Sequence, residues 1–323
     1  MRPSHIAALI LTLACALPAR AQEFPTGPVR VIVPLGAGGA MDSLARILAG
    51  RLQERLGKPF VVENITGGGT LIAAQTLAKA APDGHTLLIA PSGMLTTNAA
   101  LFKQLPYDPV KDFTPIAHYV EIAFVLVVNA GLPIRSVADL VKAAKEKPGA
   151  LTYSSTGIGQ VPHLAGEMFA RATGVELAHV PYRGAPQALL DVVAGHVSMT
   201  FADPSVAAQL IAEGKVRALG VSSTARLDIM PDVPPLADAG VPGFEAASWH
   251  MLLAPAATPR PVAQKIQDEW MRAVNAADLR EQLAKMSLTP LKSEPLDELP
   301  GFVKREADKW GGIVRAIGIA GTQ

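Results

Sequence analysis

The chain has 323 residues, of which 49% are hydrophobic and 18% are charged, and its formal net charge is +1 at pH 7. This composition is typical of a folded globular protein and excludes an intrinsically disordered chain. The balanced charge offers no basic excess for a nucleic-acid-binding surface, and the length favours two domains over one.

The first 21 residues have the pattern of a secretory signal peptide. Arg2 supplies a positive charge, the apolar run IAALILTLACAL follows, and Ala-Arg-Ala at 19–21 fits a cleavage site. We expect cleavage after Ala21, with a membrane anchor or lipidation of Cys15 as alternatives. Because Cys15 is the only cysteine, the processed chain would have no disulfide and no thiolate metal ligand.

Short apolar runs then alternate with segments of helical periodicity, which predicts an α/β fold with mainly parallel sheets flanked by helices. In the first helix, after the run at 29–34, one face carries apolar side chains at helical spacing: Met41, Leu44, Ala45, Leu48 and Leu52. Further helices are predicted over 136–149, 185–195 and 258–274. The predicted strands are 29–34, 59–64, 86–90, 122–128, 151–154, 177–180, 197–201, 216–221 and 251–255.

The expected domains are two lobes that exchange chain twice, because no Gly/Ser linker separates them. We expect the crossings near 115–122 and 242–250. Residues 22–121 with 250–323 would form the first lobe, and residues 122–249 the second. A ligand would then bind between the lobes, at the carboxyl ends of strands.

A glycine-rich turn follows the first predicted strand and contains Gly36, Gly38 and Gly39. A dinucleotide-binding turn needs a third glycine where Met41 stands, and no Gly-Lys-Ser/Thr follows for a phosphate loop. Glycines between a strand and a helix still let a small anion approach unpaired backbone N–H groups. The turn therefore suits a carboxylate better than a nucleotide.

A second turn of the same kind lies in the segment SSTGIGQVPH at 154–163. Gly157 and Gly159 fit the first two glycine positions of a dinucleotide-binding turn, and Pro162 stands where the third glycine belongs. One such turn would be read as a plain tight turn. Two of them favour one anion site shared by both lobes.

Hydrolase and metal chemistry have little support. Ser154 or Ser155 with His163 could form a nucleophile–base pair, but no G-x-S-x-G motif is present. His163, His179 and His196 are too widely spaced for the usual zinc motifs. We expect no catalytic residue, no metal and no cofactor.

Three further residues leave alternatives open. Tyr182 can cover a ligand and donate through its hydroxyl. Arg183 can clamp a carboxylate or remain a solvated charge at the rim. Asp203 can favour an ammonium group in the ligand, or cap the helix that begins near Pro204.

Taken together, eight segments in order along the chain resemble the substrate-binding proteins of tripartite tricarboxylate transporters, the Bug (Bordetella uptake gene) family. One departure is Gln160, where the family usually has serine. The segments are VPLGAGGAMDSLAR, VVENITGGG, APDGHTLLIA, LPYDPVKDFTPIA, LTYSSTGIGQVPHLAGEMF, HVPYRGAPQALLDVVAGHVSMTF, GKVRALGVSSTARLDIMPDVPPLADAGVPGFEAASW and LLAPAATPRPVAQKI.

The resemblance implies a two-lobe periplasmic binding protein fold, type II-like, that closes on a small carboxylate. It also implies a monomer in the periplasm of a Gram-negative bacterium that delivers its ligand to large and small membrane subunits of a transporter. A receptor that presents the same ligand to a sensor protein is the alternative. The predicted ligand-binding residues are Gly36, Gly38, Gly39, Asp42, Ser92, Ser154, Thr156, Gly157, Gly159, Gln160, His163, Tyr182, Gly184 and Asp203.

Overall fold

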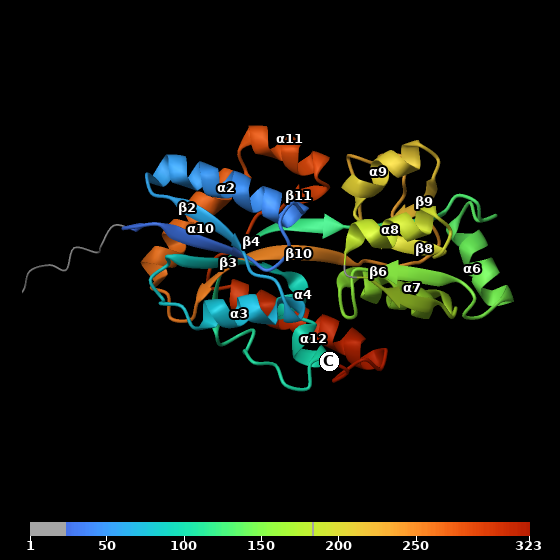
Figure 1. Cartoon of the computed structure of the whole chain (residues 1–323), viewed down its shortest axis with the longest axis horizontal. Helices are drawn as coiled ribbons and strands as arrows, with labels where there is room; N and C mark the ends of the chain where they lie inside the picture. Colours follow the sequence, from blue (N-terminus) through green and yellow to red (C-terminus); the bar gives the residue numbers. More distant parts are fainter. Residues whose placement is uncertain (1–23, 183) are drawn as a thin grey trace, which may run out of the picture.

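The computed structural model describes residues 24–182 and 184–323, so the predicted signal peptide and Arg183 lie outside the described residues. The chain forms two α/β lobes (Figure 1), which confirms the predicted two-lobe architecture. We call the six-stranded sheet with its helices the first lobe and the five-stranded sheet with its helices the second lobe.

The first lobe is built from both ends of the chain. Its strands are β1 (Val29–Val33), β2 (Phe60–Asn64), β3 (Thr86–Pro91), β4 (Phe113–Ala123), β10 (Ala247–Pro255) and β11 (Leu288–Pro290), in the sheet order β11-β4-β10-β3-β1-β2. Its helices are α2 (Ala40–Leu56), the short 3-10 helix η1 (Gly68–Thr70), α3 (Leu71–Ala78), α4 (Ser92–Leu95), α5 (Asn98–Leu101), α10 (Arg260–Val274), α11 (Ala277–Lys285) and α12 (Leu299–Ala316).

The second lobe is built from the middle of the chain. Its strands are β5 (Val125–Asn129), β6 (Thr152–Ser155), β7 (Ala178–Pro181), β8 (Met199–Ala202) and β9 (Val216–Val221), in the order β7-β6-β8-β5-β9. Its helices are α6 (Val137–Glu146), α7 (Val161–Thr173), α8 (Ala185–Val193) and α9 (Pro204–Ala212).

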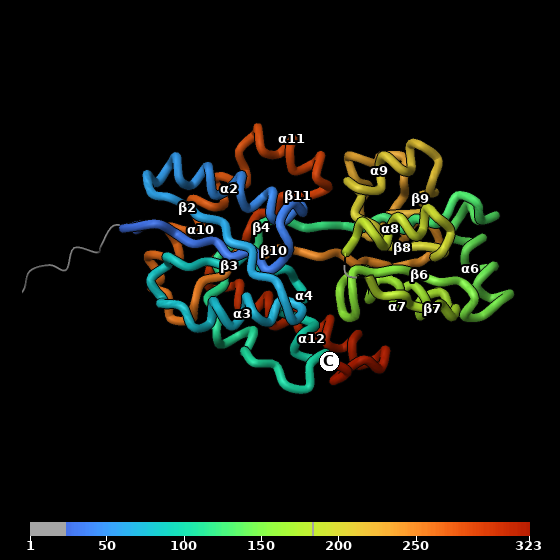
Figure 2. Tube along the Cα trace, viewed as in Figure 1, coloured from blue at the N-terminus to red at the C-terminus, as the bar shows by residue number. Residues whose placement is uncertain are grey.

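Both sheets are mixed, so the prediction of mainly parallel sheets was wrong. β1 pairs in parallel with β2 and β3, whereas β10 is antiparallel to β3 and β4. In the second sheet β6 is parallel to β7 and β8, whereas β5 is antiparallel to β8 and β9. The reason is the double crossing: β4 leads out of the first lobe and β10 leads back into it, so these neighbours run in opposite directions (Figure 2).

The predicted strand at 122–128 is in fact two strands in different sheets. β4 ends at Ala123, Phe124 follows, and β5 begins at Val125. The apolar run is continuous because both strand ends are buried, so hydrophobicity alone did not mark the change of sheet.

Two local predictions are confirmed. The predicted apolar face of α2 is buried against the first sheet, with Leu44, Leu48 and Leu52 fully enclosed. The α6 helix begins as its capping pattern indicated, because the Ser136 side chain accepts a hydrogen bond from the backbone N–H of Asp139 at 3.1 Å.

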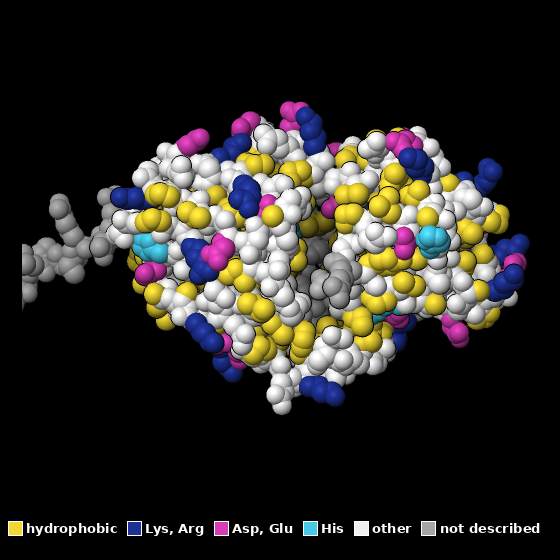
Figure 3. Space-filling model, in the orientation of Figure 1, with side chains coloured by type: hydrophobic (Ala, Val, Ile, Leu, Met, Phe, Trp, Pro, Cys, Tyr) yellow, Lys and Arg dark blue, Asp and Glu magenta, His cyan; other side chains and the backbone are white. Residues whose placement is uncertain are grey.

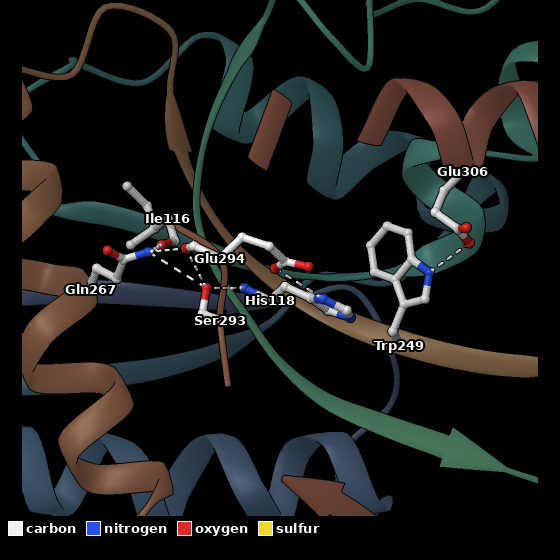
Figure 4. Close-up of polar contacts among 7 residues, drawn as sticks. All are labelled: Ile116, His118, Trp249, Gln267, Ser293, Glu294 and Glu306. Atoms are coloured by element: carbon white, nitrogen blue, oxygen red, sulfur yellow. Dashed lines mark hydrogen bonds and ion pairs between the residues drawn. The ribbon is translucent and has the colours of Figure 1, made fainter. Parts of the chain in front are cut away.

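Helix α12 belongs to both lobes. Val303, near its start, lies in the hydrophobic core of the first lobe, whereas Trp310 lies in the core of the second. Between them, Glu306 accepts hydrogen bonds from the indole N–H groups of Trp249 in β10 (Figure 4) and of Trp310, at 3.3 and 3.0 Å. The helix therefore links the lobes in addition to the two crossing segments.

Among the described helices, none combines the length and the apolar composition that crossing a membrane would require.

Candidate functional site

A cavity of about 170 Å³ lies between the lobes, where the surface is hollowed in Figure 3. Both lobes line it, so a ligand held there would bridge them. The first lobe contributes Leu35, Met41, Pro91, Ser92, Gly93, Ile122, Ser248 and His250; the second lobe, with Phe124 from the crossing, contributes Thr156, Gln160, Val161, Pro162, Ala185, Phe201 and Asp203.

The N-termini of several helices meet at this cavity. Met41 lies in the first turn of α2, Val161 in that of α7 and Ala185 in that of α8, while Asp203 is the N-cap of α9. The first N–H groups of a helix have no intrahelical acceptor, and the helix dipole makes that end positive. The cavity is therefore suited to an anion even without a formal positive charge.

The first glycine turn is held by the helix that follows it. Gly38 has φ +85°, and its N–H donates to Oδ2 of Asp42, four residues on, at 2.9 Å. The buried Asp42 carboxylate also accepts hydrogen bonds from Arg46 and Asn64. The Arg46 and Gly38 donors lower the Asp42 pKa to about 2. Asp42 thus supports the backbone of the turn from its buried side, whereas Gly36 and Gly39 are exposed to solvent.

The second glycine turn uses the same arrangement with a different side chain. Gly159 has φ +78°, and its N–H donates to Nδ1 of His163, again four residues on, at 3.0 Å. Asp42 and His163 both occupy the third position of their helix. Each side chain accepts from the residue before the N-cap, so the two turns are built alike on opposite sides of the cleft.

A stacked pair of histidines supports the second turn. The rings of His163 and His179 lie 4.0 Å apart between centroids. His179 Nε2 contacts Ser155 Oγ at 2.7 Å, and Ser155 Oγ accepts the N–H of Gly157 at 3.1 Å. Burial lowers the pKa of both histidines to about 4. Both rings are therefore uncharged at neutral pH, which leaves His163 Nδ1 free to accept.

Of the predicted binding residues, Ser92, Thr156, Gln160 and Asp203 line the cavity. The glycines of the two turns do not line the cavity, although Gly36, Gly157 and Gly159 are each adjacent in sequence to a lining residue. Gly184 likewise directly precedes the lining residue Ala185.

Other predicted residues have their polar atoms engaged elsewhere. Ser154 is fully buried and donates to the carbonyl of Ala188 at 3.0 Å. The Tyr182 hydroxyl donates to Asp191 at 2.6 Å, and that bond raises the Tyr182 pKa to about 12. These contacts hold the second lobe together and leave neither hydroxyl directed at the cavity.

Asp203 takes the capping role, one of the two alternatives that the sequence left open. Its Oδ1 atom accepts hydrogen bonds from the N–H and the hydroxyl of Ser205, at 2.9 and 2.7 Å, so it caps α9. It also lines the cavity, and burial raises its pKa.

Sequence reasoning missed the wall formed by Ser248 and His250. Both side chains come from β10, which was predicted only from residue 251. The Ser248 hydroxyl lies 3.1 Å from that of Ser92. The available signal was the Ser-x-His alternation just before the buried run, which places both side chains on one face of the strand.

The structure gives no support to catalysis by Ser154 with His163, because each side chain is bonded to a different partner. Across residues 24–182 and 184–323, no group of three or more His, Cys, Asp and Glu side chains is arranged to hold a metal ion.

Residues 44–319 match the model of TctC, described as the tripartite tricarboxylate transporter family receptor. Protein BugT of Bordetella pertussis is 32% identical, over 97% of this chain and 96% of that protein.

Two solved structures show the same fold. An R. palustris protein with adipate is 33% identical, with a TM-score of 0.84 over 92% of this chain and 99% of that one. MatC from Rhodopseudomonas palustris with bound malate is 32% identical, with a TM-score of 0.79 over 90% of this chain and all of that one.

Proposed function

Because this chain belongs to the family of tripartite tricarboxylate transporter receptors that includes the Bug proteins, we propose that it is a periplasmic receptor that binds a small carboxylate between its lobes. The relatives with bound adipate and malate support this function. The chain would act by binding and release rather than by catalysis.

The observation that carries the proposal is the meeting of helix N-termini from both lobes at one cavity. A carboxylate placed there would accept backbone hydrogen bonds from each lobe and be most strongly bound in the closed form. Ligand would therefore increase the population of the closed form. The two glycine turns, built alike around Gly38 and Gly159, would bring these N–H groups close to the ligand.

In the cell, the protein would be exported by its signal peptide, remain monomeric and deliver the ligand to the membrane subunits of a transporter. Delivery to a sensor protein is the second candidate. Uptake of labelled ligand by cells that lack the gene distinguishes the transport role from the sensor role. Loss of uptake would indicate transport. Normal uptake with loss of the transcriptional response to the ligand would indicate a sensor role. The lobe boundaries remain part of the proposal, with the expected division into residues 22–121 with 250–323 and residues 122–249 shifted so that all of β4, to Ala123, and all of β10, from Ala247, falls in the first lobe.

Binding is tested by thermal shift of the mature protein, refolded to remove any co-purified ligand, against mono-, di- and tricarboxylates. A saturable rise in melting temperature is expected for at least one class, since a ligand that binds only the native state stabilises it. No rise with any carboxylate would contradict the proposal.

The nature of the carboxylate contacts is tested with two variants. Gly39→Val, at the N-cap of α2, should weaken binding more than Arg183→Ala if backbone N–H groups hold the anion. The reverse order in calorimetry would show that an ion pair with Arg183 holds it instead.

A further inference from the structure

The side chains that line the cavity offer little charge that could balance a dicarboxylate. Among the described residues that line it there is no Lys or Arg, and Asp203 is the one acidic side chain. Burial lowers the pKa of His250 to about 3, so its ring is uncharged at neutral pH. The described lining therefore offers no cation to a second carboxylate.

Asp203 has one oxygen available for a ligand. Its Oδ1 atom is occupied by the two hydrogen bonds from Ser205, whereas its Oδ2 atom has no hydrogen-bond partner among the described residues. The N-terminus of α9 favours the charged carboxylate and opposes the effect of burial, which raises the Asp203 pKa. The carboxylate of this cavity-lining residue thus has an acceptor atom without a donor among the described residues.

The facing wall in the first lobe also has unused polar groups. His250 lines the cavity but is only 3% exposed, and its buried Nδ1 atom has no hydrogen-bond partner among the described residues. The hydroxyls of Ser92 and Ser248 contact each other and can rotate to serve a ligand. A polar group of this wall that a ligand reaches gains a hydrogen-bond partner on binding, which favours a ligand whose far end can form hydrogen bonds.

On these grounds we propose that the ligand is a monocarboxylate whose other end carries a hydrogen-bond donor, an ammonium or hydroxyl group, and that Asp203 and His250 select this end against a second carboxylate. The inference rests on the carboxylate-receptor function proposed above and adds the class of ligand. The proposed ligand class differs from that of the two relatives described above, whose structures contain the dicarboxylates adipate and malate.

The physical reason is the cost of placing two carboxylates together. A second carboxylate beside Asp203 would bring like charges into a partly dehydrated cavity. An ammonium group would instead donate to Oδ2 of Asp203 in a charge-assisted hydrogen bond. A hydroxyl could donate to Asp203 and accept from His250 or a serine.

The test is calorimetric titration of the mature protein with acids of equal carbon number that differ only at the far end. The C4 set is butanoate, 4-hydroxybutanoate, 4-aminobutanoate and succinate; the C6 set is hexanoate, 6-hydroxyhexanoate, 6-aminohexanoate and adipate; citrate and benzoate complete the panel. We expect an amino- or hydroxy-ended acid to bind at least tenfold more tightly than the dicarboxylate of the same length.

Three variants test whether Asp203 and His250 cause the expected ligand preference. Asp203→Asn keeps the cap acceptor and should lower the affinity for the amino-ended acid at least tenfold without weakening the dicarboxylate. His250→Phe should weaken the hydroxy-ended acid most. Ser205→Ala is the matched control, since it removes one bond to Oδ1 and leaves the carboxylate; its ligand preference should be that of the wild type.

Each other outcome contradicts the inference in a distinct way. Tightest binding of a di- or tricarboxylate, or of an acid with no far-end donor, would overturn it and leave the receptor function standing. If the dicarboxylate preference were then lost in Arg183→Gln, Arg183 would be the residue that selects the far end. No binding of any acid on the panel would overturn the receptor function as well.

Discussion

Replacing Asp42 by Asn tests how the first glycine turn is held. The carboxylate accepts hydrogen bonds on both oxygens, from Gly38 and Arg46 at Oδ2 and from Asn64 and Arg46 at Oδ1. An amide has only one accepting oxygen, so its NH2 group would oppose the donors on one side. The turn should lose either the Gly38 bond or the link to Asn64.

The magnitude follows from the Asp42 pKa, which lies at about 2 in place of 3.8. At 1.36 kcal/mol per pKa unit the difference corresponds to ~2.4 kcal/mol. The Arg46 side chain is 52% exposed, so screening by solvent reduces the expected loss to about 1–2 kcal/mol. Because the folded-state pKa of Asp42 is lowered, this stabilisation is present above about pH 4 and is lost as the pH falls towards 2.

The assay is urea unfolding followed by circular dichroism at pH 7 and pH 3, together with titration of the best carboxylate. We expect Asp42→Asn to lower the unfolding free energy at pH 7, by less at pH 3, and to weaken ligand binding about tenfold, or ~1.4 kcal/mol. Asp139→Asn is the matched control. Its carboxylate accepts the N–H of Arg135 at the same position of α6, away from the cleft, so ligand affinity should not change. Unchanged affinity in Asp42→Asn would refute the idea that this carboxylate shapes the binding turn.

Three further predictions concern the second turn and the cleft wall. Gly159→Ala should lower the unfolding free energy by about 1–2 kcal/mol in urea titration. The reason is that φ is +78° and the added Cβ would lie 2.5 Å from Leu101 Cδ2 in the first lobe. An unchanged unfolding free energy would show that the turn relaxes freely. His163→Asn should retain more ligand affinity in calorimetry than His163→Phe, since only Asn can accept from Gly159, and equal losses would make ring stacking the decisive feature. The folded-state pKa of His250 is lowered to about 3, so stability should fall as the pH drops below 6.5. In thermal and urea unfolding His250→Phe should reduce that slope by about 1.4 kcal/mol per pH unit between pH 6 and pH 4; an unchanged slope would mean that the ring is charged in the folded protein.

Local patterns predicted the elements well where one signal was sufficient. The apolar spacing from Met41 to Leu52 identified the buried face of α2, and Ser136 with Asp139 marked the start of α6. These features depend on residues close in sequence, so the sequence contains the whole signal.

The wall of the candidate site depended on contacts between distant segments. Ser248 and His250 reach the cavity only because β10 lies beside β3 and β4, which no local pattern specifies. Similarly, Asp42 and His163 have residue types that suit a ligand contact. Their supporting role becomes visible only once their hydrogen bonds to Gly38 and Gly159 are known.

The sharing of α12 between the lobes bears on how the protein unfolds. Trp310 is almost completely buried among residues of the second lobe, although its helix begins in the core of the first. A fragment containing only residues 122–249 would lack this side chain and expose the apolar surface that it covers. The two lobes should therefore melt as one cooperative unit rather than as separable modules, with a single transition in calorimetry.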